Sequence, residues 1–128
     1  DHGRASQLLH DATFLSGLPK VVTQIDGETQ AAWRPRLNLQ YIQDKYIQPD
    51  IIVDVTDFMG QKLEAVKAFK TQFYDPSSGE PSTYISSPEF FESIVARSRE
   101  FGKSINATYG EGFTSRKLLG VNSLFNLS

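Results

Sequence analysis

The first two residues, Asp1 and His2, have side chains that can bind a divalent metal and move a proton, and they directly precede a predicted helix. Imidazole is a common zinc ligand, and carboxylates act as general acids or bases. A catalytic zinc takes about three protein ligands and a water, and we find no partner set for His2 elsewhere in the sequence. Two interpretations stay open: His2 is one ligand of a site completed by polypeptide outside this sequence, or Asp1 and His2 are a solvated terminal pair.

Three other side chains have chemistry that suits a polar small molecule. Arg34 follows Trp33, and its guanidinium could hold a carboxylate through two hydrogen bonds or be a simple loop cation. Tyr84 follows a long loop, and its hydroxyl could donate to a substrate oxygen, while its ring could instead anchor the loop by packing. His10 is eight residues from His2 and out of step with the apolar helix face, so we expect a surface histidine.

Three carboxylates remain without an assigned role. Asp54 and Asp57 flank the end of a predicted strand, where α/β folds often place functional groups, although a helix cap explains Asp57 as well. Glu111 lies between two glycines that allow close backbone approach. A glycine-rich phosphate loop, a Gly-x-Ser-x-Gly elbow and a cysteine nucleophile are absent from the sequence.

The composition is that of an ordinary globular protein and excludes several classes. The 128 residues are 39% hydrophobic and 22% charged, with a net charge of −2, and form one domain or a large piece of one. A nucleic-acid partner is not expected, since basic residues form no stripe. The chain has no cysteine, no apolar run near the ~20 residues of a membrane span and no visible signal peptide. We therefore expect a cytoplasmic protein without a membrane partner.

Hydrophobic periodicity predicts the elements that must position these residues. Helices are expected at 3–16, from 57 to about 72, and at 87–102, with strands at 37–43 and 50–55. The β-branched run in the second strand indicates a well-buried position with neighbours on both sides. This order predicts an α/β layered fold. Two strands between three helices make a poor core, so we expect further strands outside this sequence.

The ends and connections of these elements carry their own signals. Residues 20–36 are expected to form a loop, with room for a short helix, around a turn at Asp26-Gly27. Thr56 or Asp57 is the expected cap of the second helix, whose buried face would include Met59, Leu63, Val66, Phe69 and Phe73. Ser87-Pro88 starts the third helix, and Gly102 can end it. In the tail, the expected element is a short strand or turn at Leu118, Leu119 and Val121.

Several stretches, taken in order, resemble the LmbE-like zinc de-N-acetylases, also called the GlcNAc-phosphatidylinositol deacetylase family. The opening, Asp1-His2-Gly3-Arg4-Ala5, is similar to the end of a His-Pro-Asp-His-x-x-Ala motif. Each motif alone is weak, but their order and spacing are fairly specific, and the most similar subgroup is the deacetylase of bacillithiol biosynthesis. The other matching stretches are Asp50–Thr56, Ala65–Phe73, Ala96–Gly102 and Tyr109–Phe113.

The resemblance implies a Rossmann-like, three-layer α/β fold about twice as long as this chain, with residues 1–128 as its C-terminal half. It also implies a Zn²⁺ cofactor, with His2 as one ligand and the other ligands and the base aspartate in the missing N-terminal half. Asp1 is the candidate catalytic residue within this chain. Arg34 and Tyr84 align roughly with substrate-binding residues of the family.

The activity implied is hydrolytic de-N-acetylation of an N-acetylglucosamine conjugate, with N-acetylglucosaminyl malate as the expected compound, whose malate carboxylate Arg34 would suit. A homo-oligomer is also implied, often a hexamer. The isolated chain would then be inactive. The alternative is a non-catalytic interaction or sugar-binding module that keeps the scaffold without a complete metal site.

Overall fold

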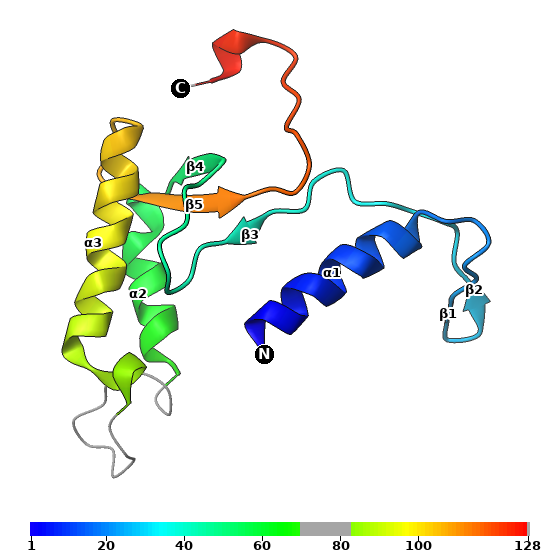
Figure 1. Ribbon diagram of the computed structural model, residues 1–128, viewed down its shortest axis with the longest axis horizontal. Helices are drawn as coiled ribbons and strands as arrows, with labels where there is room; N and C mark the ends of the chain where they lie inside the picture. The colour runs from blue at the N-terminus through cyan, green and yellow to red at the C-terminus, as the bar shows by residue number, and fades with distance from the viewer. Residues whose placement is uncertain (70–82, 128) are drawn as a thin grey trace. The chain divides into compact units, whose positions relative to one another are not determined.

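The computed structural model describes residues 1–69 and 83–127, which divide into two compact units (Figure 1). The first unit comprises residues 1–40 and 115–119, and the second comprises residues 41–114 and the C-terminal segment from 120. Both units combine helices or turns with small sheets, so the predicted mixed α/β class is confirmed at this level. In the described residues, no helix is long and apolar enough to cross a membrane.

Helix α1 (His2–Ser16) dominates the first unit and confirms the helix expected at 3–16. Two hydrogen bonds join it to the rest of the unit: Ser6 Oγ donates to Gln40 Oε1 at 2.7 Å, and Asn38 Nδ2 donates to Thr13 Oγ1 at 3.1 Å. The predicted apolar side is left open, and no residue of α1 is buried. Leu8 and Leu9, for example, are 70% and 50% exposed.

The segment after α1 forms a small hairpin, which the sequence analysis did not predict. Strands β1 (Gln24–Ile25) and β2 (Glu28–Thr29) pair antiparallel around Asp26-Gly27. Both turn residues have positive φ, 51° and 83°, which is the type I′ geometry that matches strand twist. The turn signal was therefore right, and residues 20–36 form the expected loop apart from this hairpin, while the short helix does not form.

A three-stranded sheet in the order β3-β5-β4 underlies the second unit. Strand β4 (Ile51–Asp54) agrees with the strand expected at 50–55, and β3 (Gln40–Tyr41) is a remnant of the strand expected at 37–43. The central strand, β5 (Gly110–Thr114), pairs antiparallel with β4 from Ile51↔Phe113 to Asp54↔Gly110. It falls in the tail, where neither the strand nor the turn expected at Leu118, Leu119 and Val121 forms.

Glycines explain both the position of β5 and its absence from the prediction. Helix α3 (Pro88–Ser104) packs against β5 (Figure 1), and buried Gly110 and Gly112 face this contact. A Cβ at Gly110 would lie 2.7 Å from Ile52 Cγ2, and one at Gly112 would lie 2.8 Å from Phe101 Cε2. Glycine is unfavourable in a strand interior and marks a close approach of other groups. Strand propensity therefore does not predict a strand here.

The two helices of the second unit form where they were predicted, but each ends at a different residue from the one expected. A short 3₁₀ turn, η1 (Thr56–Phe58), leads into α2 (Met59–Lys67), whose N-cap is Phe58 without a side-chain hydrogen bond. Neither Thr56 nor Asp57 caps α2, which corrects that expectation. The helix also ends at Lys67 rather than near 72, and part of the expected extension, including Phe73, lies outside the described residues.

Helix α3 begins as predicted, because the Ser87 hydroxyl accepts a hydrogen bond from Phe90 N at 3.1 Å and Pro88 is the first helical residue. Gly102 does not end the helix, which continues to Ser104. A Cβ at Gly102 would lie 2.7 Å from Tyr109 N, so glycine here allows the chain to return close to the helix. The remaining 3₁₀ turns are η2 (Tyr84–Ser86) and η3 (Leu124–Asn126).

The core of the described residues is small. Met59 and Phe101 are the buried hydrophobic side chains, with Ser98 as the buried polar one. Strand β4 is only partly covered, and Val53 is 44% exposed. The expectation that this strand is well buried was therefore wrong for the described residues, where β5 is its partner. A neighbour on its other side, from polypeptide outside this sequence, stays a prediction.

Candidate functional site

Asp1 and His2 lie at the N-terminal end of α1. Asp1 is the N-cap: its carbonyl accepts from Ala5 N at 2.9 Å, but its side chain makes no capping hydrogen bond. His2, the first helical residue, is exposed, as is His10, which agrees with the surface position expected for His10. Among residues 1–69 and 83–127, no group of three or more His, Cys, Asp or Glu side chains could hold a metal ion. These residues therefore offer His2 as one possible zinc ligand rather than a complete set.

Arg34 lies at the opposite end of the same helix. One guanidinium nitrogen, Nη2, donates to the carbonyl oxygen of Phe14 at 2.8 Å, and the guanidinium carbon is 5.2 Å from the Phe14 ring centroid. A cation at this end complements the partial negative charge of the helix C-terminus. With a rise of 1.5 Å per residue, Phe14 is about 18 Å from His2 along the helix. The structure thus does not bring Arg34 and His2 together.

Tyr84, the last of the four predicted site residues, belongs to the second unit and begins η2. Its ring packs edge-on against Phe90 with centroids 5.2 Å apart, and its hydroxyl donates to Asp44 Oδ1 at 3.3 Å. The side chain is still 69% exposed. Both expected features are therefore compatible with this arrangement: the ring packs, and the hydroxyl stays accessible.

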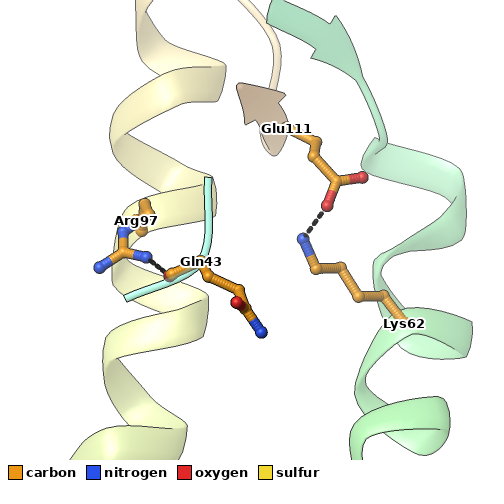
Figure 2. Close-up of polar contacts among 4 residues, drawn as sticks. All are labelled: Gln43, Lys62, Arg97 and Glu111. Carbon is orange, nitrogen blue, oxygen red and sulfur yellow. Dashed lines mark hydrogen bonds and ion pairs between the residues drawn. The ribbon is translucent and has the colours of Figure 1, made fainter. Parts of the chain in front are cut away.

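Arg97 is a polar anchor that the sequence analysis missed. From helix α3 it donates to the backbone carbonyl oxygens of Gln43 and Asp44 (Figure 2 shows the Gln43 contact). A guanidinium is suited to such a fork because its donors are planar and fixed in direction. The partners are main-chain atoms 53 and 54 residues away, so no side-chain pattern in the sequence could have revealed the contact.

Glu111, whose role the sequence left open, forms an ion pair with Lys62. Lys62 Nζ on α2 and Glu111 Oε1 on β5 are 2.7 Å apart (Figure 2), with side chains 28% and 32% exposed. Since β5 was not predicted as a strand, the sequence offered no reason to place these residues 49 positions apart in contact. The pair ties α2 to the central strand, which makes a structural role sufficient to explain Glu111.

A double-mutant cycle with Lys62→Ala and Glu111→Ala is expected to give a coupling free energy of about 0.5–1 kcal/mol, because solvent screens a partly exposed pair. The coupling should shrink as NaCl is raised from about 0.05 to about 1 M. Urea unfolding of the four proteins measures it. The exposed pair Lys67–Glu64, three residues apart on α2 at 2.9 Å, is the matched control and should couple more weakly. Equal coupling in both pairs would contradict the inference that the pair of Lys62 and Glu111 ties α2 to the central strand.

Asp54 is occupied in a local turn at the end of β4. Its carboxylate accepts from Thr56 N at 2.9 Å, and hydrogen bonds from the Thr56 side chain and backbone hold the pKa of Asp54 below its usual value of 3.8. The Thr56 hydroxyl in turn accepts from Tyr109 N at 3.2 Å. These bonds connect β4 to the start of β5. A structural role is therefore sufficient to explain Asp54.

Comparison with known proteins supports the fold. No family model matches the chain. Among solved structures, it is similar to the conserved protein TT1542 from Thermus thermophilus, with 25% sequence identity and a TM-score of 0.71. The match covers 91% of this chain and 46% of TT1542. The chain therefore spans less than half the length of this structural neighbour.

Proposed function

We propose that this chain is the C-terminal part of a LmbE-like zinc de-N-acetylase with a Rossmann-like, three-layer fold, most similar to the deacetylase of bacillithiol biosynthesis. The observation that carries the proposal is the ordered series of motifs from Asp1-His2 to Tyr109–Phe113. The coverage of TT1542 is compatible with it, since a chain of that length has room for a second half. The apolar side of α1, open in the described residues, is also what a helix shows when its packing partner is elsewhere.

In this proposal, His2 is one zinc ligand, and further ligands and the base aspartate come from polypeptide preceding Asp1. A zinc held in this way would supply a water that ionises near neutral pH and can then act as the nucleophile toward an amide. Asp1, adjacent to His2, is placed to hold or move a proton at its carboxylate. Arg34 keeps guanidinium donors that Phe14 does not use, but its place at the other end of α1, about 18 Å from His2, is too far for it to bind a small substrate at the same zinc.

The proposed substrate is an N-acetylglucosamine conjugate, with N-acetylglucosaminyl malate as the first compound to test. The proposal includes a cytoplasmic location and a homo-oligomer, with a hexamer as the expected size. The test uses the full-length protein: metal analysis should find about one zinc per chain, and the conjugate should release acetate. A protein of full length with neither bound metal nor amidase activity would refute the proposal.

A second candidate is a non-catalytic module that binds a protein or a sugar. The exposed leucines of α1 favour it, because an open apolar helix face is typical of an interaction surface. The mass of the native protein separates the two: about 14.3 kDa supports the module, and about twice that supports the enzyme. Sugar binding that needs neither zinc nor His2 would also support the module.

A further inference from the structure

Strand β4 is an edge of its sheet, and it lacks the features that protect edge strands. The sheet order is β3-β5-β4, so within residues 1–69 and 83–127 no strand pairs with the side of β4 away from β5. Natural edge strands are usually shielded by lysine, proline or a bulge. Residues 51–53 are Ile, Ile and Val, their pairing with β5 is unbroken, and Val53 is 44% exposed. An open apolar edge of this kind is a template for another strand.

The hydrogen bonds of β4 show which of its backbone groups face away from β5. Val55 N donates to Tyr109 O at 3.0 Å, in register with the pairing of the two strands. In an antiparallel pair, hydrogen-bonded positions alternate with positions whose N–H and C=O groups point to the other side. Counting back from Val55, the outward positions of the strand are Ile52 and Asp54.

A second copy of β4 fits this edge in one antiparallel register. Asp50 N and Thr56 N already donate within the chain, at 2.8 Å to a carbonyl oxygen of β5 and at 2.9 Å to the Asp54 carboxylate. The outward groups that remain are those of Ile52 and Asp54. Pairing Ile52 with Asp54 of the second copy uses all of them, since each of the two symmetric pairs exchanges both hydrogen bonds. Val53 then faces Val53 of the second copy across the two-fold axis.

The chain order favours a second copy over polypeptide that precedes Asp1. Strand β3 comes first in the chain among the strands of this sheet, and it lies at the opposite edge from β4. Strands consecutive in sequence are neighbours in about two-thirds of cases, so a preceding strand is expected beside β3. The edge at β4 then stays open in the longer protein. Its self-complementary register is what a two-fold interface between identical chains requires.

We propose that β4 is a self-association surface, at which two copies of this chain join their sheets antiparallel through Ile52 and Asp54. This mode of pairing is strand addition, in which main-chain hydrogen bonds hold the partner. The inference goes beyond the proposed function, because neither zinc nor deacetylase activity enters it. It gives the homo-oligomer expected there a defined surface within the second unit.

A cysteine at the two-fold position tests the register. Val53→Cys in the full-length protein should form a disulfide-linked dimer on mild oxidation, and peptide mass spectrometry should find two chains joined at position 53. Opposed residues at such a position have Cα atoms about 4.5 Å apart, within the span of a disulfide. Val22→Cys is the matched control, because Val22 is 67% exposed but lies outside β4. A Val53→Cys protein that links no better than Val22→Cys would overturn the proposal.

Charge at the same position tests whether this contact holds the copies together. Val53→Lys and Val53→Glu should each weaken self-association at least about tenfold, because like charges would face each other across the axis. An equal mixture of the two variants should associate again, because opposite charges then meet. Light scattering after size-exclusion chromatography measures the mass of each sample.

A mixture that stays dissociated, or variants as associated as wild type, would show that position 53 does not lie on a two-fold axis and would overturn the proposal. A wild-type protein that is monomeric would overturn it as well, whatever its activity. Zinc content and acetate release decide the proposed function separately, so an oligomer joined at position 53 without either would retain this interface and lose the enzyme.

Discussion

Replacing His2 by alanine in the full-length protein is expected to remove most of the bound zinc and nearly all deacetylase activity. In the proposed site, the variant would lose one of about three protein ligands, and a two-ligand site holds zinc weakly. Loss of a residue that only supports a ligand costs about 10–100-fold in metal affinity, so loss of the ligand should cost at least about 100-fold. Zinc content by mass spectrometry after dialysis and acetate release together measure the effect.

His10→Ala provides the matched control, because His10 is on the same helix, is exposed as well and lies eight residues from His2. It should keep wild-type zinc and activity. If His2→Ala retains its zinc, His2 is not a ligand and the proposed site loses the ligand assigned to this chain. If both variants lose zinc equally, the effect comes from the helix rather than from an imidazole at position 2.

Replacing Gly110 by alanine should destabilise the full-length protein by about 2–3 kcal/mol, in the range of overpacked cores. The added Cβ would lie 2.7 Å from Ile52 Cγ2 and 2.8 Å from both Gly102 N and the Phe101 carbonyl carbon. Two of these atoms belong to the backbone of α3, which cannot move aside as a side chain can. The clash would separate the central strand from its helix. Guanidinium chloride unfolding measures the change.

Gly60→Ala is the control for Gly110→Ala, with the opposite expected sign. Gly60 lies in α2, and a Cβ there would meet no atom within 4 Å. Alanine is the better helix former by up to about 1 kcal/mol, so this variant should be as stable as wild type or more stable. A Gly110→Ala protein as stable as Gly60→Ala would show that α3 does not approach β5 this closely.

The elements that sequence patterns located share a property: their signals are local. Helix α3 was predicted at its start because Ser87 and Pro88 are a cap and a first-turn residue, and both act within the first turn of the helix. The hairpin turn at Asp26-Gly27 was found for the same reason, although the strands beside it were not. The candidate residues Asp1, His2, Arg34 and Tyr84 came from residue type, motif order and resemblance.

What was missed depends on distant partners. Strand β5 was hidden because Gly110 and Gly112 lower strand propensity, and only the close packing of α3 makes glycine the fitting residue there. The helix expected to continue to about 72 ends at Lys67, and the predicted cap of α2 is replaced by a 3₁₀ turn. Helix ends are set by a balance of small terms that tertiary contacts can shift.

Residue type and local spacing alone were sufficient to find the three helices, strand β4 and the turn at Asp26-Gly27. Tertiary structure alone placed Arg34 on the C-terminal end of α1, joined Lys62 to Glu111 and directed the Tyr84 hydroxyl to Asp44. The reason is physical: helix periodicity, caps and turns arise from neighbours a few residues apart. Hydrogen bonds and ion pairs between residues 20 to 54 positions apart form only after the chain has brought them within about 3 Å.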